Sequence, residues 1–233
     1  MKMLRDDDVQ SRVGLEDWRV LAGRLHGTFR SGSMARGIDL VRRIGEVAEE
    51  MDHHPDVDLR YYRVHVTLTT HAAHGLTERD VALAARISEA AAQLGMPAEP
   101  GRPRAVEIAV DALDIPAVMP FWKAVLGYRT KLGADGDEAA SVDLEDPDAR
   151  APGVWFQQMD APRPGRGRLH VDVHVPHDEA EARVRAALSA GGAPRDGRLR
   201  TGVVGARRRR GQRGVRLHVA GTGLRTSSAE DGR

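Results

Sequence analysis

Hydrophobic and polar residues follow two different periods in the first hundred residues. Apolar residues recur every three or four positions over 38–51 and over 81–94, which predicts two helices that each bury one face. These stripes consist of Ile38, Val41, Ile44, Val47, Ala48 and Met51, then Val81, Ala84, Ile87, Ala91 and Leu94. Residues 64–69 alternate with a period of two, which is typical of a strand with one covered face. We therefore predict an α+β fold, a small antiparallel sheet with helices on one face.

Before the second helix, "GLTERD" supplies a capping threonine, Thr77, with Asp80 three residues later. This spacing is an acidic variant of the capping box, in which two side chains satisfy free backbone N–H groups at the start of a helix. We therefore expect the second helix to begin directly after Thr77.

The same elements appear in a different order after residue 104. Residues 105–114 predict a strand and residues 115–129 a helix, and "ASVDLED" and "GVWFQQMD" predict two more strands. The order then restarts with the strand "RLHVDVHVP" and a helix that ends at Gly191 and Gly192. We expect a partial βαβββ domain with an internal duplication, whose second copy lacks its last strands.

The segment "PAEPGRPR" packs three prolines and a glycine into eight residues, which is typical of a linker. We expect one domain over residues 1–97, a linker over 98–104 and a second, incomplete domain over 105–192. Residues 193–233 then form an arginine- and glycine-rich tail that we expect to be disordered.

Composition narrows the classes of protein that fit. The chain has no cysteine, which excludes disulfides and thiolate metal sites. No apolar run approaches the length of a membrane span, and the start "MKMLRDDDVQ" has no apolar core of a secretory signal. We therefore expect a cytoplasmic protein without a membrane partner.

The segment "DHHPDVDLRYYRVHVTLTTH" holds four of the ten histidines. His53 and His54 directly follow the first predicted helix, and His71 follows the strand. If the strand passes beside the end of the helix, these three imidazoles converge, and nearby carboxylates can orient them. The candidate carboxylates are Asp52, Asp56 and Asp80. Imidazole has an unperturbed pKa of about 6.5, so it can give and take a proton near neutral pH.

Other readings of the histidines remain open. Three histidines could bind zinc, but neighbouring side chains diverge on an extended backbone, so we favour acid–base chemistry over a metal. A structural or solvated role is the expectation for His65 and His74. We expect His65 to lie on the sheet face opposite the core, because it alternates with the covered positions.

This segment resembles the pterin-4a-carbinolamine dehydratase family over roughly residues 10–95. The resemblance rests on Glu49, His53-His54-Pro55-Asp56, Tyr61, the strand from Val64 to Leu68, Thr70-His71 and the run from Gly75 to Asp80. It includes Trp18, Leu25 and Phe29 of two expected opening strands. Met34 stands where the family usually has phenylalanine, and we expect a conservative substitution in the core.

The resemblance implies dehydration of a 4a-hydroxytetrahydropterin to the quinonoid dihydropterin, which recycles tetrahydrobiopterin and requires no cofactor or metal. It implies that His53, His54 and His71 are the catalytic acid–base set, without deciding which is acid and which is base. Candidate substrate-binding residues are Asp52, Pro55, Thr70 and Asp80. It also implies a homo-oligomer. The alternatives are a non-catalytic binding or dimerisation module, or a glyoxalase-like small-molecule-binding protein.

The second domain resembles glyoxalase-like domains of the vicinal-oxygen-chelate superfamily. "PFWKAVLGY" is similar to their helix signature, and "RLHVDVHV" is similar to the strand that opens their second half. Members that use a metal place ligands on the first strand of each half, and Glu107 and His170 fall near those positions. We expect these two residues to line a pocket and predict no metal.

The arginines of the tail allow two explanations. From Ala193 onward, eleven arginines face three acidic residues, and the run Arg207–Arg210 is typical of an arm that binds nucleic acid. The closing strand of the glyoxalase-like family is missing, however, and the codons of residues 203–224, read one base later, can encode it. We therefore predict that the tail is a frameshifted product and that nucleic acid is not a partner.

Overall fold

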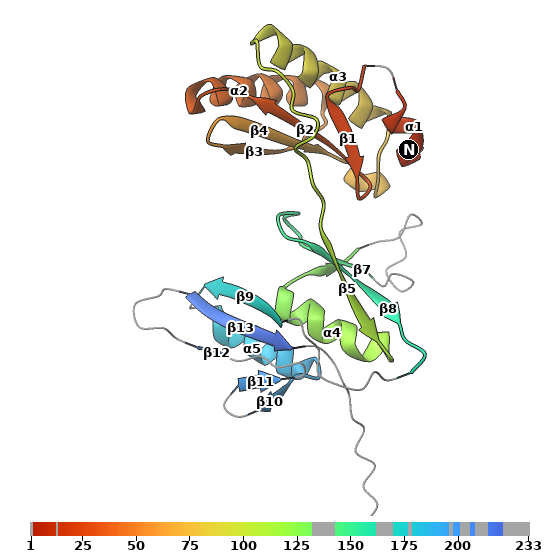
Figure 1. Cartoon of the computed structure of the whole chain (residues 1–233), viewed down its shortest axis with the longest axis vertical. Helices are drawn as coiled ribbons and strands as arrows, with labels where there is room; N and C mark the ends of the chain where they lie inside the picture. The colour runs from red at the N-terminus through yellow and green to blue at the C-terminus, as the bar shows by residue number, and fades with distance from the viewer. Residues whose placement is uncertain are drawn as a thin grey trace, which may run out of the picture. The chain divides into compact units, whose positions relative to one another are not determined.

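The structure is a computed structural model, and it divides the chain into two compact units (Figure 1). The first unit ends at Ala105 and the second begins at Val106. The residues described are 2–12, 14–131, 143–161, 170–176, 179–195, 198–200, 206–207 and 214–220.

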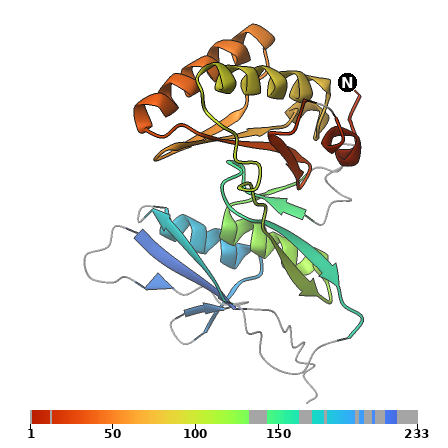
Figure 2. The same ribbon diagram turned by 45° about the horizontal axis from the view of Figure 1, so that its top comes forward.

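The first unit is a four-stranded antiparallel sheet with the order β1-β2-β4-β3 and two long helices on one face (Figures 1 and 2). Its elements are α1 (Asp6–Gln10), β1 (Trp18–Leu21), β2 (Arg24–Arg30), α2 (Met34–Met51), β3 (Asp56–Arg60), β4 (Arg63–Leu68), η1 (His71–Ala73) and α3 (Glu78–Gln93). The predicted α+β class is confirmed. The period-two pattern of β4 buries Val64, Val66 and Leu68 against the helices.

The helix α2 buries Gly37, Leu40, Ile44, Val47 and Ala48, of which Ile44, Val47 and Ala48 belong to the predicted stripe. Ile38 was also predicted to be buried, but it is 55% exposed, so that part of the prediction was wrong. Met34, which was predicted to be a core residue, is 48% exposed. It is the first residue of α2, directly after the N-cap Ser33, and it lies outside the buried stripe. The prediction for Met34 was therefore wrong.

The beginning of the predicted linker pairs with β2. Arg30 N donates to Pro97 O at 2.9 Å, and Glu99 N donates to Thr28 O at 2.7 Å. Arg63 Nε also donates to the Glu99 carboxylate at 2.6 Å, and this bond lowers the pKa of Glu99. Residues 97–99 therefore cover the edge of β2 beyond the end of β1.

The second unit opens with β5 (Glu107–Ala112), α4 (Ile115–Leu126), β6 (Arg129–Thr130), β7 (Asp143–Glu145) and β8 (Gly153–Gln158). These strands form a sheet with the order β5-β8-β7-β6, in which β5 and β8 are parallel. Asp114 caps α4 by accepting from Ala117 N at 3.0 Å, and Gly127 ends the helix in the left-handed region. Phe121, Trp122 and Val125 of α4 are buried against the sheet. The strand–helix–strand order agrees with the expected βαβββ domain.

The rest of the second unit contains β9 (His170–Pro176), α5 (Ala180–Ser189), β10 (Ala193–Arg195), β11 (Arg198–Arg200), β12 (Ala206–Arg207) and β13 (Gly214–Ala220). The tail was expected to be disordered, yet the structure places four strands in it, and β13 pairs with all of β9. The apolar Val215, Leu217 and Val219 alternate with polar residues, a period that suits a strand. This pairing is antiparallel, whereas β5 and β8 are parallel. The second half therefore does not repeat the topology of the first.

Among the residues that the structure describes, no helix is long and apolar enough to span a bilayer.

Candidate active site

The candidate site begins where α2 ends. Asp52 adopts the left-handed conformation with φ 46°, and its N–H donates to Glu49 O at 3.2 Å. His53 N donates to Ala48 O at 3.0 Å, which completes a Schellman motif. This turn redirects the chain from the helix into His53, His54 and Pro55 before β3 begins.

His53 is held by the carboxylate of Asp80, a residue of α3. His53 Nε2 lies 2.8 Å from Asp80 Oδ1, and the two residues are 7% and 0% exposed. Thr70, two residues beyond the end of β4, donates from its hydroxyl to Asp80 Oδ2 at 2.7 Å. One buried carboxylate thus connects the end of α2, the end of β4 and the start of α3.

Asp80 also closes the first turn of α3. Thr77 N donates to Asp80 Oδ2 at 2.7 Å, and the Thr77 side chain accepts from the backbone of the same turn. The predicted capping box is therefore confirmed. Because the carboxylate is fully buried, protein donors take the place of water as its hydrogen-bond partners.

The other two histidines of the predicted set are exposed. His54 Nε2 lies 3.1 Å from Glu49 Oε1, one turn back in α2. His71 is the first residue of η1, adjacent to Thr70. The buried His53 and the exposed His71 are thus linked through Thr70 and Asp80, and His54 follows His53 directly in the chain.

Only one of the three candidate carboxylates contacts an imidazole among the described residues. Asp52 is exposed, and its carboxylate lies 3.7 Å from Arg79 Nη2. Asp56 lies 3.9 Å from Arg24 Nη1. The sequence spacing missed Glu49 as the partner of His54, although the five-residue separation across a helix end allows the contact.

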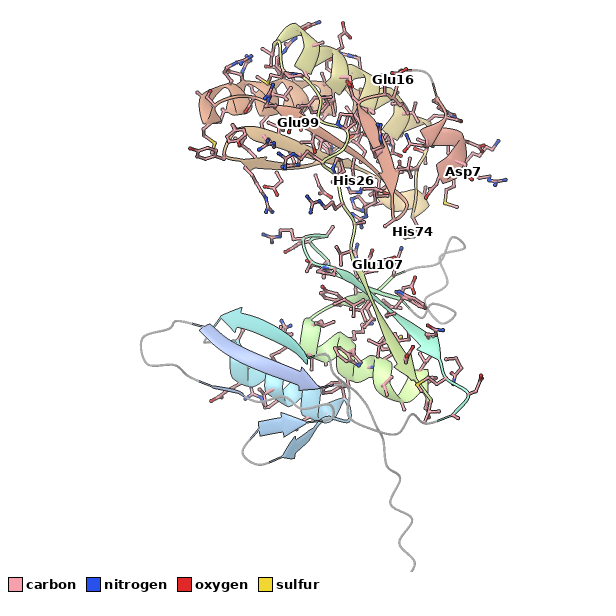
Figure 3. All side chains as sticks on the ribbon, viewed as in Figure 1. Asp7, Glu16, His26, His74, Glu99 and Glu107 are labelled. Atoms are coloured by element: carbon pink, nitrogen blue, oxygen red, sulfur yellow. The ribbon has the colours of Figure 1, made fainter. Side chains whose placement is uncertain are left out.

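His65 lies on the sheet face opposite the core, as predicted. It belongs to one of two histidine–threonine pairs on that face. Thr28 Oγ1 and His65 Nδ1 are 3.0 Å apart, and Thr67 Oγ1 and His26 Nδ1 are 3.2 Å apart. Each pair joins residues directly opposite each other on β2 and β4. Figure 3 labels His26 on the side of the sheet away from the helices, and His74 near η1.

Burial lowers the pKa of both histidines in these pairs. Desolvation is the main cause that lowers the pKa of His26, and Arg24 lowers it further. Desolvation also lowers the pKa of His65, against an opposing contribution from Asp58. Three arginines near His65 add to the lowering: Arg60, Arg63 and Arg102. Both imidazoles are therefore held toward the neutral form.

The candidate metal ligands of the second unit lie in different sheets. Glu107 begins β5 in the four-stranded sheet, and His170 begins β9 in the three-stranded sheet. In the described part of the chain, no three histidine, aspartate or glutamate side chains form a group that could hold a metal ion. Glu107 and His170 remain candidate pocket residues.

The first unit is similar in sequence to known proteins of one family. A protein provisionally named pterin-4-alpha-carbinolamine dehydratase from Mycolicibacterium smegmatis is 44% identical over 89 residues, which cover 38% of this chain and 95% of that protein. The family model described as "Pterin 4 alpha carbinolamine dehydratase" matches residues 2–90. The chain belongs to the pterin-4a-carbinolamine dehydratase family.

Two further proteins match the dehydratase domain. A provisionally named relative from Thermomicrobium roseum is 41% identical over 92 residues, 38% of this chain and 99% of that protein. A crystal structure titled "transcriptional coactivator/pterin dehydratase from Brucella Melitensis" matches 39% of this chain and 99% of that chain, with 25% identity and a TM-score of 0.36. A second family model, "Glyoxalase-like domain", matches residues 107–219. The predicted resemblance of both parts is confirmed.

Proposed function

We propose that the dehydratase domain dehydrates 4a-hydroxytetrahydropterin to quinonoid dihydropterin by histidine general acid–base catalysis, in the recycling of tetrahydrobiopterin. The observation that carries the proposal is the buried contact of His53 with Asp80, which Thr70 and Thr77 support. It orients the imidazole of His53, which precedes His54 in the chain and is connected to His71 through Asp80 and Thr70.

The reaction needs two proton transfers. The bond between C4a and its hydroxyl oxygen breaks while an acid protonates that oxygen, and water leaves. A base takes the proton from N5, and the C4a–N5 double bond forms from the released electron pair. Two imidazoles can supply both transfers near neutral pH, and proton exchange with solvent restores them.

The hydrogen bonds favour one tautomer for His53. Oδ2 of Asp80 accepts from Thr70 and from the Thr77 N–H, and a carboxylate offers only acceptors to the imidazole. The proton therefore resides on His53 Nε2, which leaves Nδ1 for chemistry. Glu49 places the proton of His54 on Nε2 by the same reasoning. Each ring then gives or takes a proton through Nδ1.

Among the candidate substrate-binding residues, Asp80 and Thr70 suit a supporting role. Both are buried, at 0% and 4% exposure, and they bond each other. We assign them to orienting His53, and we retain Asp52 and Pro55, at the turn that carries the histidines, as residues that contact the pterin.

A spectroscopic assay of carbinolamine dehydration with single alanine variants tests the function. We expect His53→Ala, His54→Ala and His71→Ala each to lower the rate by about 10²- to 10⁴-fold, because each removes an acid, a base or its orientation. His65→Ala, on the opposite face of the sheet, is the control and should retain the wild-type rate. Near-full activity of His54→Ala would contradict the acid–base assignment.

We also propose the domain organisation predicted from the sequence, with a dehydratase domain over 1–97, a linker over 98–104, a glyoxalase-like domain over 105–192 and an out-of-frame tail. The antiparallel pairing of β9 with β13, where the first half has a parallel pair, supports a tail that is foreign to the fold. The glyoxalase-like match nevertheless continues to residue 219. Resequencing the gene tests whether the tail is frameshifted, and an uninterrupted single frame would refute the frameshift.

The assembly and location of the protein remain proposals of the same kind. We propose a cytoplasmic homo-oligomer without a nucleic-acid partner. Light scattering of the purified chain measures the oligomeric state, and a monomer at micromolar concentration would refute this part.

A further inference from the structure

Arg79, which the predicted acid–base set does not include, contacts the backbone of the histidine turn. It is the second residue of α3, directly before Asp80. Its Nη2 donates to Met51 O at 3.1 Å and also to Asp52 O, and it lies 3.7 Å from Asp52 Oδ2. The guanidinium therefore binds the two carbonyl groups that immediately precede His53.

These carbonyls need a donor because of how α2 ends. The Schellman motif satisfies the carbonyls of Ala48 and Glu49 and leaves those of the last helical residues without an intrahelical partner. A cation at this position also interacts favourably with the partial negative charge at the C-terminus of α2. Hydrogen bonds from a charged donor are stronger than those between neutral groups.

Arg79 lies in the first turn of α3, a position that is unfavourable for a positive charge. A cation in the first turn of a helix is opposed by the positive end of that helix's dipole. The cost is offset here because the side chain reaches the negative end of α2 instead. The arginine therefore suits the end of α2 better than the start of α3.

Arg79 and Asp80 together hold both parts of His53. Asp80 bonds the imidazole, and Arg79 bonds the carbonyl of the peptide group that joins Asp52 to His53. With that peptide plane fixed, the left-handed turn at Asp52 sets the direction in which His53 and His54 leave the helix. We propose that Arg79 is a positioning residue that aligns His53 and His54 for proton transfer, an inference that rests on the proposed dehydratase function.

A purely structural role for Arg79 would be to tie α3 to α2, and the chain offers a matched control for that role. Arg86, two turns further along α3, bonds Glu50 of α2 at 3.0 Å. Its side chain is 47% exposed, close to the 40% of Arg79. Arg86 therefore joins the same two helices without contacting the backbone before His53.

Steady-state dehydration kinetics of Arg79→Ala, Arg79→Lys and Arg86→Ala separate the two roles. We expect Arg79→Ala to lower kcat by about 10- to 10²-fold with little change in KM, because misplaced catalytic groups slow the chemical step. Arg79→Lys should recover part of the loss, since lysine keeps the charge but lacks the planar fork. Arg86→Ala should keep the wild-type kcat. Equal kcat values for Arg79→Ala and Arg86→Ala, at equal folded fraction by circular dichroism, would overturn the proposal.

Imidazole NMR of the ¹⁵N-labelled chain gives a second measurement that needs no activity. We expect the ring resonances of His53 and His54 to shift in Arg79→Ala and to stay in place in Arg86→Ala. Unchanged resonances in Arg79→Ala would overturn the positioning role. A wild-type protein with no dehydratase activity would instead refute the proposed function, and the NMR comparison would still decide whether Arg79 orients the two rings.

Discussion

Asp80 is a carboxylate without exposed surface that accepts from an imidazole, a hydroxyl and a backbone N–H. The sequence predicted the backbone part, because the spacing of Thr77 and Asp80 is local and capping depends on local geometry. It could not show that Oδ1 meets His53, which is 27 residues away. That contact depends on how α2 and α3 pack together, and spacing within each helix contains no such information.

The two histidine–threonine pairs on the sheet face opposite the core predict how stability depends on pH. The pKa values of His26 and His65 are lowered in the folded state, so the unfolded chain binds protons first as the pH falls below about 6.5. The melting temperature of the first unit should therefore be level above that pH and decline from pH 6.5 to 5.5. The double variant His26→Asn with His65→Asn should flatten the decline, while the exposed-site variant His74→Asn should keep it. A slope unchanged in the double variant would contradict this origin.

At the scale of elements, the helices and strands of the first unit follow from short-range patterns. The stripe over residues 38–51 and the cap at Thr77 predicted α2 and α3 closely, because each helix buries a single face. The pairing of residues 97–99 with β2 was not predictable from composition. Proline and glycine indicate irregular chain, whereas the pairing depends on β1 ending early and leaving Thr28 and Arg30 with free backbone groups.

Alanine at two glycines of the first unit should have opposite effects on its stability. A Cβ at Gly27 would lie 2.9 Å from the Trp18 ring, which is buried and bonded to Ser88. Gly27→Ala should therefore destabilise the first unit by about 1–3 kcal/mol. A Cβ at Gly45, in α2, meets nothing within 4 Å, so Gly45→Ala should stabilise it by up to about 1 kcal/mol. Urea denaturation measures both, and a Gly27→Ala variant as stable as wild type would show that the strand pair tolerates the methyl group.

At the scale of the whole molecule, the two units have separate hydrophobic cores with no residue in common among those described. The sequence predicted two domains because the pattern restarts after the proline-rich segment. It did not predict the strands β10–β13, because it assigned the tail by its charge and not by the alternation of Val215, Leu217 and Val219. Overall charge describes solubility and partners more directly than it describes local structure.

Separate cores predict separate unfolding. Phe121 is 2% exposed and lies in the second core, and Phe121→Ala should cost that unit about 3–5 kcal/mol. Differential scanning calorimetry should show the transition of the second unit moved to lower temperature or lost, with the first transition in place. The dehydration rate should equal that of the wild type. A matching shift of both transitions would show that the two units unfold as one.

The double use of Asp80 has a consequence for the order of folding. The carboxylate that starts α3 is also the one that holds His53, so the imidazole cannot reach its place while α3 is unformed or undocked. Catalytic competence should therefore return only with the final docking of the two helices, after secondary structure has recovered. In a refolding time course, recovery of turnover would then lag behind recovery of the far-ultraviolet signal and would report directly on tertiary assembly.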